Sequence, residues 1–149
     1  MKTDGTNGIL SFGRTFTQRP TKLTGWFKYH TEPITDATTG LEYMKGRPDT
    51  CIMWVALIDS AEPFEIRTNP NNRHLFNPDG PDVIAYGAFQ VGHDVTDWSQ
   101  FEVILNYKST SRIPNYILCV TSSSKYGDYF TGARGAELYI DDFKLLFDY

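Results

Sequence analysis

The sequence predicts an all-β protein, specifically an antiparallel β-sandwich of the jelly-roll type. Three observations favour this fold class. Apolar and polar side chains alternate along several segments of the 149-residue chain, and this two-residue period is typical of a strand with one buried face. Aromatic residues make up 15% of the sequence, and their flat rings suit pleated surfaces. No stretch supports a long amphipathic helix.

Each predicted strand follows from its own side-chain pattern. In KLTGWFKYH, Leu23, Phe27 and Tyr29 alternate with Trp26 and Lys28, so one face of the strand is apolar. TCIMWVALID and VIAYGAFQV are apolar on both faces, which predicts central strands that are covered on each side. The other predicted strands are GILSF, FEVILNY, PNYILCVTSS and AELYIDDFKLLF. Turn clusters such as NPNN, NPDGPD and GHDVTDW separate the segments, which gives roughly seven or eight strands.

Length and charge limit the class of protein. Residues 1–149 suffice for a single domain with its own core. The net charge of -4 and the pI of about 5.3 argue against nucleic acid or an anionic membrane as a partner. No segment reaches transmembrane length, so direct membrane insertion is not expected. The first residues lack the apolar region of an export signal, which fits either a cytoplasmic chain or a module whose signal lies outside this segment.

Two cysteines, Cys51 and Cys119, lie in apolar strand-like runs. The pattern favours small buried hydrophobic side chains, with a disulfide as the alternative. Because the sequence has neither a CxxC motif nor a cysteine–histidine cluster, no zinc site is expected.

The longest irregular stretch runs from residue 68 to residue 82. A loop of this length in a compact domain is often a binding loop, and the alternative is a solvated connection between the two sheets. Arg67, Asn72, Arg73 and His74 are its candidates for hydrogen bonds to a ligand.

The stretch PNYILCVTSSSKYGDYFTGARGAELYIDDFKL, residues 114–145, resembles the putative carbohydrate metabolism domain (PCMD) family of Gram-negative gut anaerobes. The segment SSSKYGDYFTGA is the most specific part of this resemblance. LTGWFKYH and VIAYG resemble further segments of the family and extend the likeness back to Leu23. The chain departs from the pattern at Ala136, where serine is common, and at Ile140, where valine is common.

The resemblance implies a fold like that of carbohydrate-binding jelly rolls. It also implies that this domain is the C-terminal module of an exported protein associated with the cell surface, with other domains preceding it. The family is linked to glycans, but the resemblance supplies no catalytic residues.

The segment SSSKYGDYFTGA reads as a structural loop. Gly127, Gly132 and Gly135 permit sharp turns or close backbone approach. Asp128 and the three serines can accept hydrogen bonds from backbone N–H groups that have no partner in a sheet. Phe130, alone among polar residues, is expected to plug the open end of the sandwich.

Asp141 and Asp142 are adjacent on the last predicted strand, so their side chains should point to opposite faces. If Tyr139, Phe143, Leu145 and Phe147 face inward, Asp141 belongs to the inner face and Asp142 to the outer one. A buried carboxylate needs a partner, because burying an isolated charge costs several kcal/mol.

Three kinds of partner are compatible with a buried Asp141. A cation such as Arg14 or Arg19 is one, and the capping of loop amides is another. The third is a structural calcium ion held by Asp141 and Asp142, as in many carbohydrate-binding jelly rolls, with further oxygens from backbone carbonyls of residues 8–13. No other cofactor is expected.

Sugars bind proteins through aromatic rings that stack on their C–H faces, next to polar groups that bond their hydroxyls. Two segments offer this combination if they share a sheet. Trp54 and Tyr86, on central strands, could line the same surface, although Trp54 also fits the core and Trp26 could pack under a loop. The candidates on the two segments are Trp26, Lys28 and His30 on the first, and Glu102, Asn106 and Lys108 on the second.

The leading hypothesis is therefore a non-catalytic module that binds or tethers a polysaccharide or oligosaccharide at the cell surface. One alternative is a structural or protein-interaction module within a surface assembly for glycan uptake. The other is a glycoside hydrolase, which needs two carboxylates about 5–10 Å apart across a cleft. No spacing in the sequence singles out such a pair, and GxSxG, the motif of a serine nucleophile, is missing. His30, His74 and His93 are scattered and fit ordinary surface positions.

Overall fold

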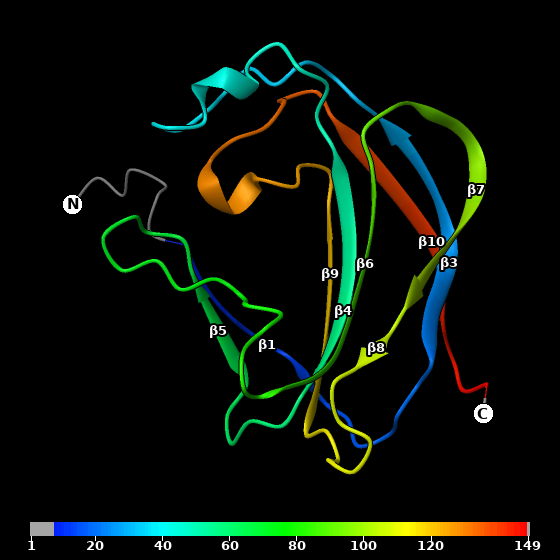
Figure 1. Cartoon of the computed structure of the whole chain (residues 1–149). Helices are drawn as coiled ribbons and strands as arrows, with labels where there is room; N and C mark the ends of the chain where they lie inside the picture. Colours follow the sequence, from blue (N-terminus) through cyan, green and yellow to red (C-terminus); the bar gives the residue numbers. More distant parts are fainter. Residues whose placement is uncertain (1–7, 149) are drawn as a thin grey trace.

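The computed structural model describes residues 8–148 and has the predicted all-β sandwich architecture (Figure 1). A three-stranded sheet with the order β10-β3-β7 faces a five-stranded sheet with the order β2-β9-β4-β6-β8, and β1 and β5 form a small third sheet. The strand pairs are antiparallel, and the chain passes between the two main sheets after β2, β3, β6, β7 and β9. The strands are β1 (Ile9–Phe12), β2 (Arg14–Thr15), β3 (Lys22–His30), β4 (Cys51–Ile58), β5 (Phe64–Arg67), β6 (Val83–Val91), β7 (Val95–Ile104), β8 (Asn106–Tyr107), β9 (Tyr116–Ser122) and β10 (Glu137–Leu146).

Two short 3-10 helices lie in the loops. The first, η1 (Glu42–Met44), belongs to the connection between β3 and β4, and the second, η2 (Gly127–Tyr129), to the connection between β9 and β10. Within residues 8–148, no helix is long and apolar enough to cross a membrane.

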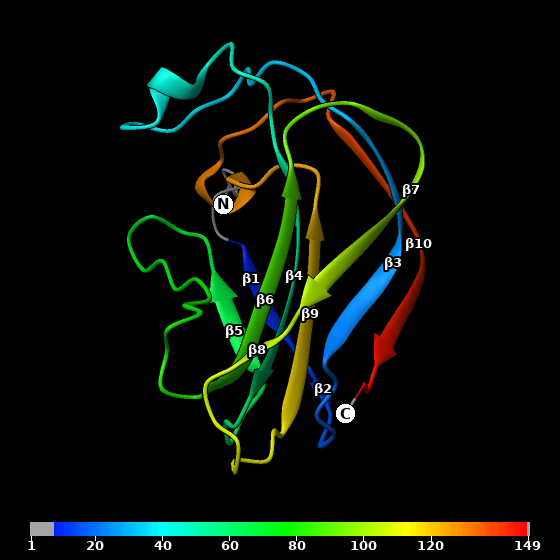
Figure 2. The ribbon, with the colours of Figure 1, turned by 45° about the vertical axis from the view of Figure 1, so that its right-hand side comes forward.

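The main core lies between the two large sheets. The apolar faces of β3, β4 and β7 meet there, and Phe27 packs edge-to-face against Phe101, with ring centroids 6.2 Å apart, and against Phe89 at 5.3 Å. A second cluster fills the opposite side of the five-stranded sheet under β1 and β5, around Ala56 and Leu118. Figures 1 and 2 show β1 and β5 on one side of β4, β6 and β9, and the three-stranded sheet on the other. Strand β4 is thus covered on both faces, as its sequence predicts.

Both cysteines are free thiols. Cys51 is buried in the main core as predicted, whereas Cys119 on β9 is exposed, so the prediction of burial was wrong there. Strand β9 lies next to the edge of its sheet, because the edge strand β2 has only two residues. Strand β2 pairs with Tyr116 and Ile117 and ends before it reaches Cys119.

The predicted strand FEVILNY is divided between the two sheets. Strand β7 starts at Val95, within the predicted turn GHDVTDW, and pairs with β3, whereas β8 pairs with β6 in the opposite sheet. Gly87 on β6 permits this crossing, because a Cβ atom there would lie 2.1 Å from the carbonyl oxygen of Ile104. As a result, Glu102 and Asn106 do not share a sheet, contrary to the prediction.

The paired aspartates form a β-bulge in β10. Asp141 lies opposite Trp26 on β3, but the next paired residue, Lys144, lies opposite Thr24, and Asp142 has a left-handed φ of 52°. Two residues of β10 are therefore accommodated opposite Gly25. Aspartate tolerates this backbone conformation better than most residues, because its short carboxylate bonds locally.

The bulge changes which residues of β10 face the core. Before it, Leu138 lies opposite Tyr29 and packs against the core, while Tyr139 is exposed; after it, Phe143 and Leu145 pack inward. The prediction that Asp141 faces inward was wrong, because its side chain is exposed. Tyr139 and Phe147, which were also assigned to the inner face, are 49% and 39% exposed. A strict two-residue period fails here, since the bulge inserts one residue.

The carboxylates of Asp141 and Asp142 each have a partner within the protein. The carboxylate of Asp141 accepts a hydrogen bond from the backbone N–H of Asp142 at 2.8 Å, and Asp142 forms an ion pair with Lys144 at 2.8 Å. Strand β1, whose carbonyls were the expected further ligands, lies on the far side of the five-stranded sheet (Figures 1 and 2). Among residues 8–148, no group of three or more His, Cys, Asp or Glu side chains is placed to hold a metal ion. Neither Arg14 nor Arg19 pairs with Asp141 in the described part of the chain; its carboxylate bonds the backbone N–H of Asp142 instead.

Candidate functional site

The outer face of the three-stranded sheet carries a regular array of side chains. In an antiparallel pair, residues directly opposite each other project from the same face. Tyr139 on β10 lies opposite Lys28 on β3, and the next row consists of Asp141, Trp26 and Gln100. The β3 residues of this face are those that the alternation in KLTGWFKYH predicts to be outward.

Three aromatic rings on this face are open to solvent. Trp26, Trp98 and Tyr139 are 40%, 46% and 49% exposed. The ammonium group of Lys28 lies 4.9 Å from the ring centroid of Trp98 and 5.4 Å from that of Tyr139. Such cation–π contacts hold the cation between two rings that come from different strands. We call Trp26, Lys28, Trp98 and Tyr139 the aromatic platform.

Polar groups border the aromatic platform. Gln100 and Asp141 flank Trp26 across the sheet, and both are exposed. Further along, the carboxylate of Glu102 forms an ion pair with Lys22 at 3.0 Å. The face therefore combines flat apolar rings with amide, carboxylate and ammonium groups, which is the chemistry that a sugar chain requires.

His30 closes one end of the platform. Its Nε2 lies 2.9 Å from a carboxylate oxygen of Glu32, and its Nδ1 lies 3.1 Å from Asp94, which also accepts the backbone N–H of Thr31. The hydrogen bond with Glu32, with support from the charge of Asp94, raises the pKa of His30 above its ordinary value. A small depression of about 200 Å³ separates His30 and Asp94 from Tyr139.

Trp54 and Tyr86 lie away from the platform. Both project from the opposite face of the five-stranded sheet, in the second core cluster. Trp54 stacks on Phe76 of the 68–82 loop, with ring centroids 4.7 Å apart and an angle of 15° between the planes. Of the two alternatives for Trp54, the structure supports the core, and Asn106 belongs to this same region beside Tyr86.

Arg67, the last residue of β5, and Arg73, on the 68–82 loop, are also separate from the platform. Arg67 pairs with Glu65 at 2.6 Å, and its backbone pairs with His74. Arg73 donates from Nε to the carbonyl of Thr68 at 3.3 Å and lies against the ring of Tyr129, 4.7 Å from its centroid.

The segment SSSKYGDYFTGA is organised by a residue that sequence reasoning missed, the buried Asp49. Its carboxylate accepts hydrogen bonds from the Ser124 hydroxyl at 2.6 Å, from the backbone N–H of Ala133 at 2.7 Å and from that of Thr50 at 2.7 Å. Gly132 is required for close approach, because a Cβ atom there would lie 2.6 Å from the Ser124 hydroxyl. The motif therefore ties the β9–β10 loop to the chain just before β4.

Other expectations for this segment are met in part. Ser122 accepts the backbone N–H of Ser124 at 3.2 Å, as predicted, but Asp128 accepts no backbone hydrogen bond from the described residues. Phe130 adopts a left-handed φ of 51° at the end of η2. It is half-buried and belongs to neither core cluster, so it does not plug the sandwich.

Sequence reasoning found Trp26, Lys28 and His30 but missed Trp98 and Tyr139. Trp98 is the last residue of GHDVTDW, a segment that was predicted to be a turn. Its local sequence does not show that β7 begins at Val95. Tyr139 was assigned to the wrong face because the bulge shifts the alternation by one residue.

The fold and the exposed aromatic face define a β-sandwich module. The chain matches the family described as "Putative carbohydrate metabolism domain" over residues 2–146 and belongs to that family. The family description relates it to carbohydrate metabolism, and the resemblance read from the sequence is confirmed.

Two solved structures share the fold. One is described as a putative glycoside hydrolase from Bacteroides thetaiotaomicron VPI-5482, with 23% identity and a TM-score of 0.71 over 94% of this chain and 41% of that chain. The other is described as a putative glycoside hydrolase from Bacteroides vulgatus ATCC 8482, with 26% identity and a TM-score of 0.67 over 91% of this chain and 55% of that chain. The chain thus spans about half the length of these proteins or less. A search of curated proteins found no match.

Proposed function

We propose that this protein is a non-catalytic carbohydrate-binding module that holds a polysaccharide on its aromatic platform. The observation that carries the proposal is the exposure of Trp26, Trp98 and Tyr139 on one sheet face, around the ammonium group of Lys28. Membership of a family related to carbohydrate metabolism supports it.

The shape of the platform favours an extended chain over a single sugar. A ring contact of this kind contributes on the order of 0.5–1.5 kcal/mol, which is too little for useful affinity if it acts alone. A polysaccharide can contact rings on β3, β7 and β10 together, so that the contacts add within one binding event. Gln100 and Asp141 then provide an amide and a carboxylate for hydroxyl groups along the chain.

The proposal extends to the setting of this activity. We propose that the module belongs to an exported protein at the cell surface, where it would hold polysaccharide close to the other domains of the same protein.

Affinity electrophoresis in native gels containing xylan, mixed-linkage β-glucan, mannan or mucin tests the proposal. We expect at least one polysaccharide to retard the wild-type protein, and Trp26→Ala and Trp98→Ala to lose at least about tenfold in affinity, since each removes a stacking surface. The matched control is Tyr43→Ala, which removes a 63% exposed ring in η1, away from the platform. Retardation of both tryptophan variants equal to that of the wild type would contradict the proposal, as would no retardation by any of the four polysaccharides.

A glycoside hydrolase is the second candidate, favoured by the descriptions of the two structural neighbours. Glu32 and Asp94 are two carboxylates on either side of His30, and Asp94 also lines the depression beside Tyr139. Both of them are engaged by the imidazole, which suits a structural cluster better than an acid and a nucleophile. The binding proposal therefore predicts no turnover of aryl glycosides, and turnover that is abolished in Asp94→Asn would favour the enzyme.

A further inference from the structure

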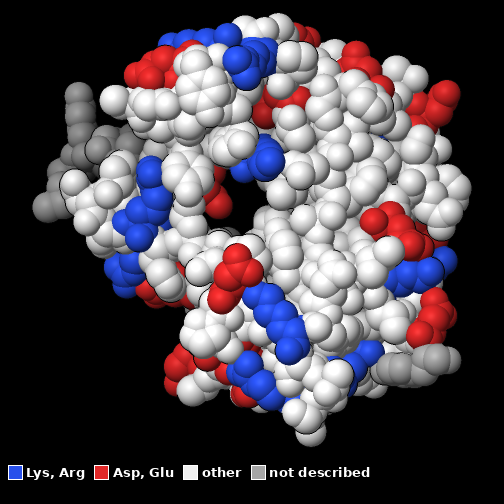
Figure 3. Space-filling model, in the orientation of Figure 1, with Lys and Arg blue, Asp and Glu red and all other residues white. Residues whose placement is uncertain are grey.

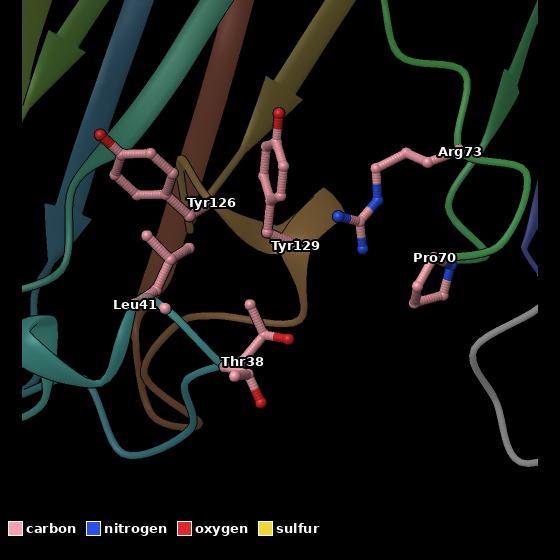
Figure 4. Close-up of a pocket in the computed structure, with 8 residues that line it drawn as sticks. Thr38, Leu41, Pro70, Arg73, Tyr126 and Tyr129 are labelled. Atoms are coloured by element: carbon pink, nitrogen blue, oxygen red, sulfur yellow. The ribbon is translucent and has the colours of Figure 1, made fainter.

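A pocket lies at the loop end of the sandwich, away from the aromatic platform. It has a volume of about 700 Å³, within the range of small-molecule sites. Three connections form it, namely the β3–β4 loop, the 68–82 loop and the segment around η2. Its lining residues are Thr38, Thr39, Gly40, Leu41, Pro70, Arg73, Tyr126 and Tyr129 (Figure 4).

Hydrogen bonds between loops hold two of the three walls together. The backbone N–H of Thr38 donates to the Thr131 hydroxyl at 3.1 Å, and Asp36 and Gly132 form an antiparallel bridge. Arg134 binds the Asp36 carboxylate through two nitrogens, at 2.7 Å and 2.9 Å. The β3–β4 loop and the η2 segment therefore form one connected wall before any ligand arrives, which lowers the entropic cost of binding.

The pocket presents aromatic rings and hydroxyl-binding groups together. In Figure 4, Tyr129 lies between Arg73 on one side and Tyr126 with Leu41 on the other. Among residues 8–148, Arg73 forms no ion pair, and its side-chain hydrogen bond to the carbonyl of Thr68 uses only Nε, so the outer guanidinium nitrogens are available to a ligand. The ring contact with Tyr129 keeps the guanidinium plane in place.

Two residues with hydroxyl side chains, Thr38 and Thr39, also line the pocket. The space-filling view shows a hollow on this side of the molecule, with acidic and basic side chains at its edge (Figure 3). An arginine donor in the same pocket as threonine hydroxyls, which can both donate and accept, matches the neighbouring hydroxyl groups of a sugar.

We propose that this pocket is a second carbohydrate subsite, which binds one or two neutral sugar rings of a short oligosaccharide or chain end. The sugar stacks on the tyrosine rings, Arg73 donates to one hydroxyl, and the hydroxyl of Thr38 or Thr39 accepts from another. A purely apolar ligand would leave Arg73 without a partner.

The pocket and the platform are separate sites on one module. The pocket lies by η2 and the 68–82 loop, on the side away from the three-stranded sheet that carries the platform (Figures 1 and 2). This inference rests on the proposed function, since it assumes that the protein binds glycans. It adds that short oligosaccharides and long polysaccharides use different surfaces.

Isothermal titration with neutral trisaccharides (cellotriose, xylotriose and mannotriose) tests the second subsite. The proteins are the wild type, the Trp26→Ala/Trp98→Ala double variant, Tyr129→Ala and Arg73→Lys. We expect at least one trisaccharide to bind the double variant as it binds the wild type. Loss of the ring in Tyr129→Ala and of the planar donor in Arg73→Lys should each weaken binding about tenfold. Tyr129→Phe keeps the ring and should stay within about twofold of the wild type.

Each outcome separates the two proposals. If polysaccharides bind the platform but no trisaccharide binds at all, the pocket proposal is overturned and the proposed function stands. If trisaccharide binding disappears in the double variant and persists in Tyr129→Ala and Arg73→Lys, short sugars use the platform and the pocket proposal is again wrong. Failure of both ligand classes overturns both. If Tyr129→Ala loses its folded spectrum by circular dichroism, the comparison of Arg73→Lys with the wild type decides.

Discussion

Asp49 shows how one buried side chain can fix the loop end of this sandwich. Its side chain is 1% exposed, yet it is a carboxylate, and it accepts hydrogen bonds from Thr50, Ser124 and Ala133. Burial of a charge is tolerated only when such donors replace water. Because the donors come from both sides of the motif SSSKYGDYFTGA, this carboxylate positions the segment that carries Tyr126 and Tyr129.

Replacement of Asp49 by alanine should destabilise the fold strongly. The variant Asp49→Ala leaves two backbone N–H groups and the Ser124 hydroxyl without their acceptor, so we expect the free energy of unfolding to fall by about 3 kcal/mol. Urea unfolding followed by circular dichroism measures this change. The control Asp97→Ala removes an exposed carboxylate of β7 and should change stability by less than about 0.5 kcal/mol. Equal stability of the two variants would show that the hydrogen bonds accepted by Asp49 do not stabilise the β9–β10 loop.

His30 should make a small pH-dependent contribution to stability. Its pKa is raised in the folded protein by Glu32 and Asp94, so the stabilisation is fully present below the ordinary histidine pKa of about 6.5 and is lost as the pH rises through the folded value. NMR titration of the His30 ring should give a midpoint above about 6.5. The stability difference between the wild type and His30→Gln should shrink as the pH rises through that midpoint. A midpoint at or below the ordinary value would contradict the His30–Glu32–Asp94 geometry.

Single residues of the platform were only partly accessible to sequence reasoning. Trp26 and Lys28 follow from alternation within one strand, because the apolar partners on the other face are unambiguous. Trp98 and Tyr139 depend on where β7 begins and on an inserted residue in β10. The start of β7 and the bulge in β10 both depend on pairing with β3. This pairing joins segments that are distant in the sequence, so the local pattern does not reveal it.

At the level of elements, β10 shows why two aspartates interrupt an apolar strand. Asp142 takes the left-handed conformation of the bulge, and Phe143 then turns inward, where its ring packs edge-to-face against Phe101 with centroids 5.2 Å apart. Gly25 on β3 makes room for these rings, because a Cβ atom there would lie 2.7 Å from both of them. The bulge thus lets one strand present Tyr139 to the platform and Phe143 to the core.

Substitutions at Asp142 should separate backbone strain from charge. Asp142→Val places a β-branched residue at φ 52°, and we expect a loss of about 1–2 kcal/mol in the free energy of unfolding. Asp142→Gly loses the same ion pair with Lys144 but has no Cβ, so its stability should stay close to that of the wild type. Thermal and urea unfolding of both variants measure the difference. If valine and glycine have the same effect, the left-handed conformation is not what the aspartate provides.

The other elements differ in how far their sequences determine them. Strands β3, β4 and β6 match their predicted segments closely. The sequence of β3 has one clearly apolar face, and those of β4 and β6 are apolar on both faces. Strand β5 was not predicted, because Phe64–Arg67 is short and pairs with β1, which is distant in the sequence. The split of β7 from β8 at Leu105 was also missed, since alternation runs through it unbroken.

At the scale of the whole molecule, two sheets with different outer surfaces explain where a ligand can bind. The outer face of the five-stranded sheet is covered by β1, β5 and the 68–82 loop, which pack Trp54 against Phe76. The outer face of the three-stranded sheet is not covered by any described element, and its rings are exposed. The sandwich therefore stabilises itself on one side and presents aromatic rings to solvent on the other.

The most direct test of this arrangement is an NMR titration of the three tryptophan indole N–H signals with soluble fragments of a polysaccharide that retards the protein in native gels. The platform predicts that the signals of Trp26 and Trp98 shift together with increasing ligand, while that of Trp54, held under the long loop, stays in place. A shift of Trp54 without the other two, or no movement of Trp26 and Trp98 at saturating ligand, would show that glycans do not bind this face.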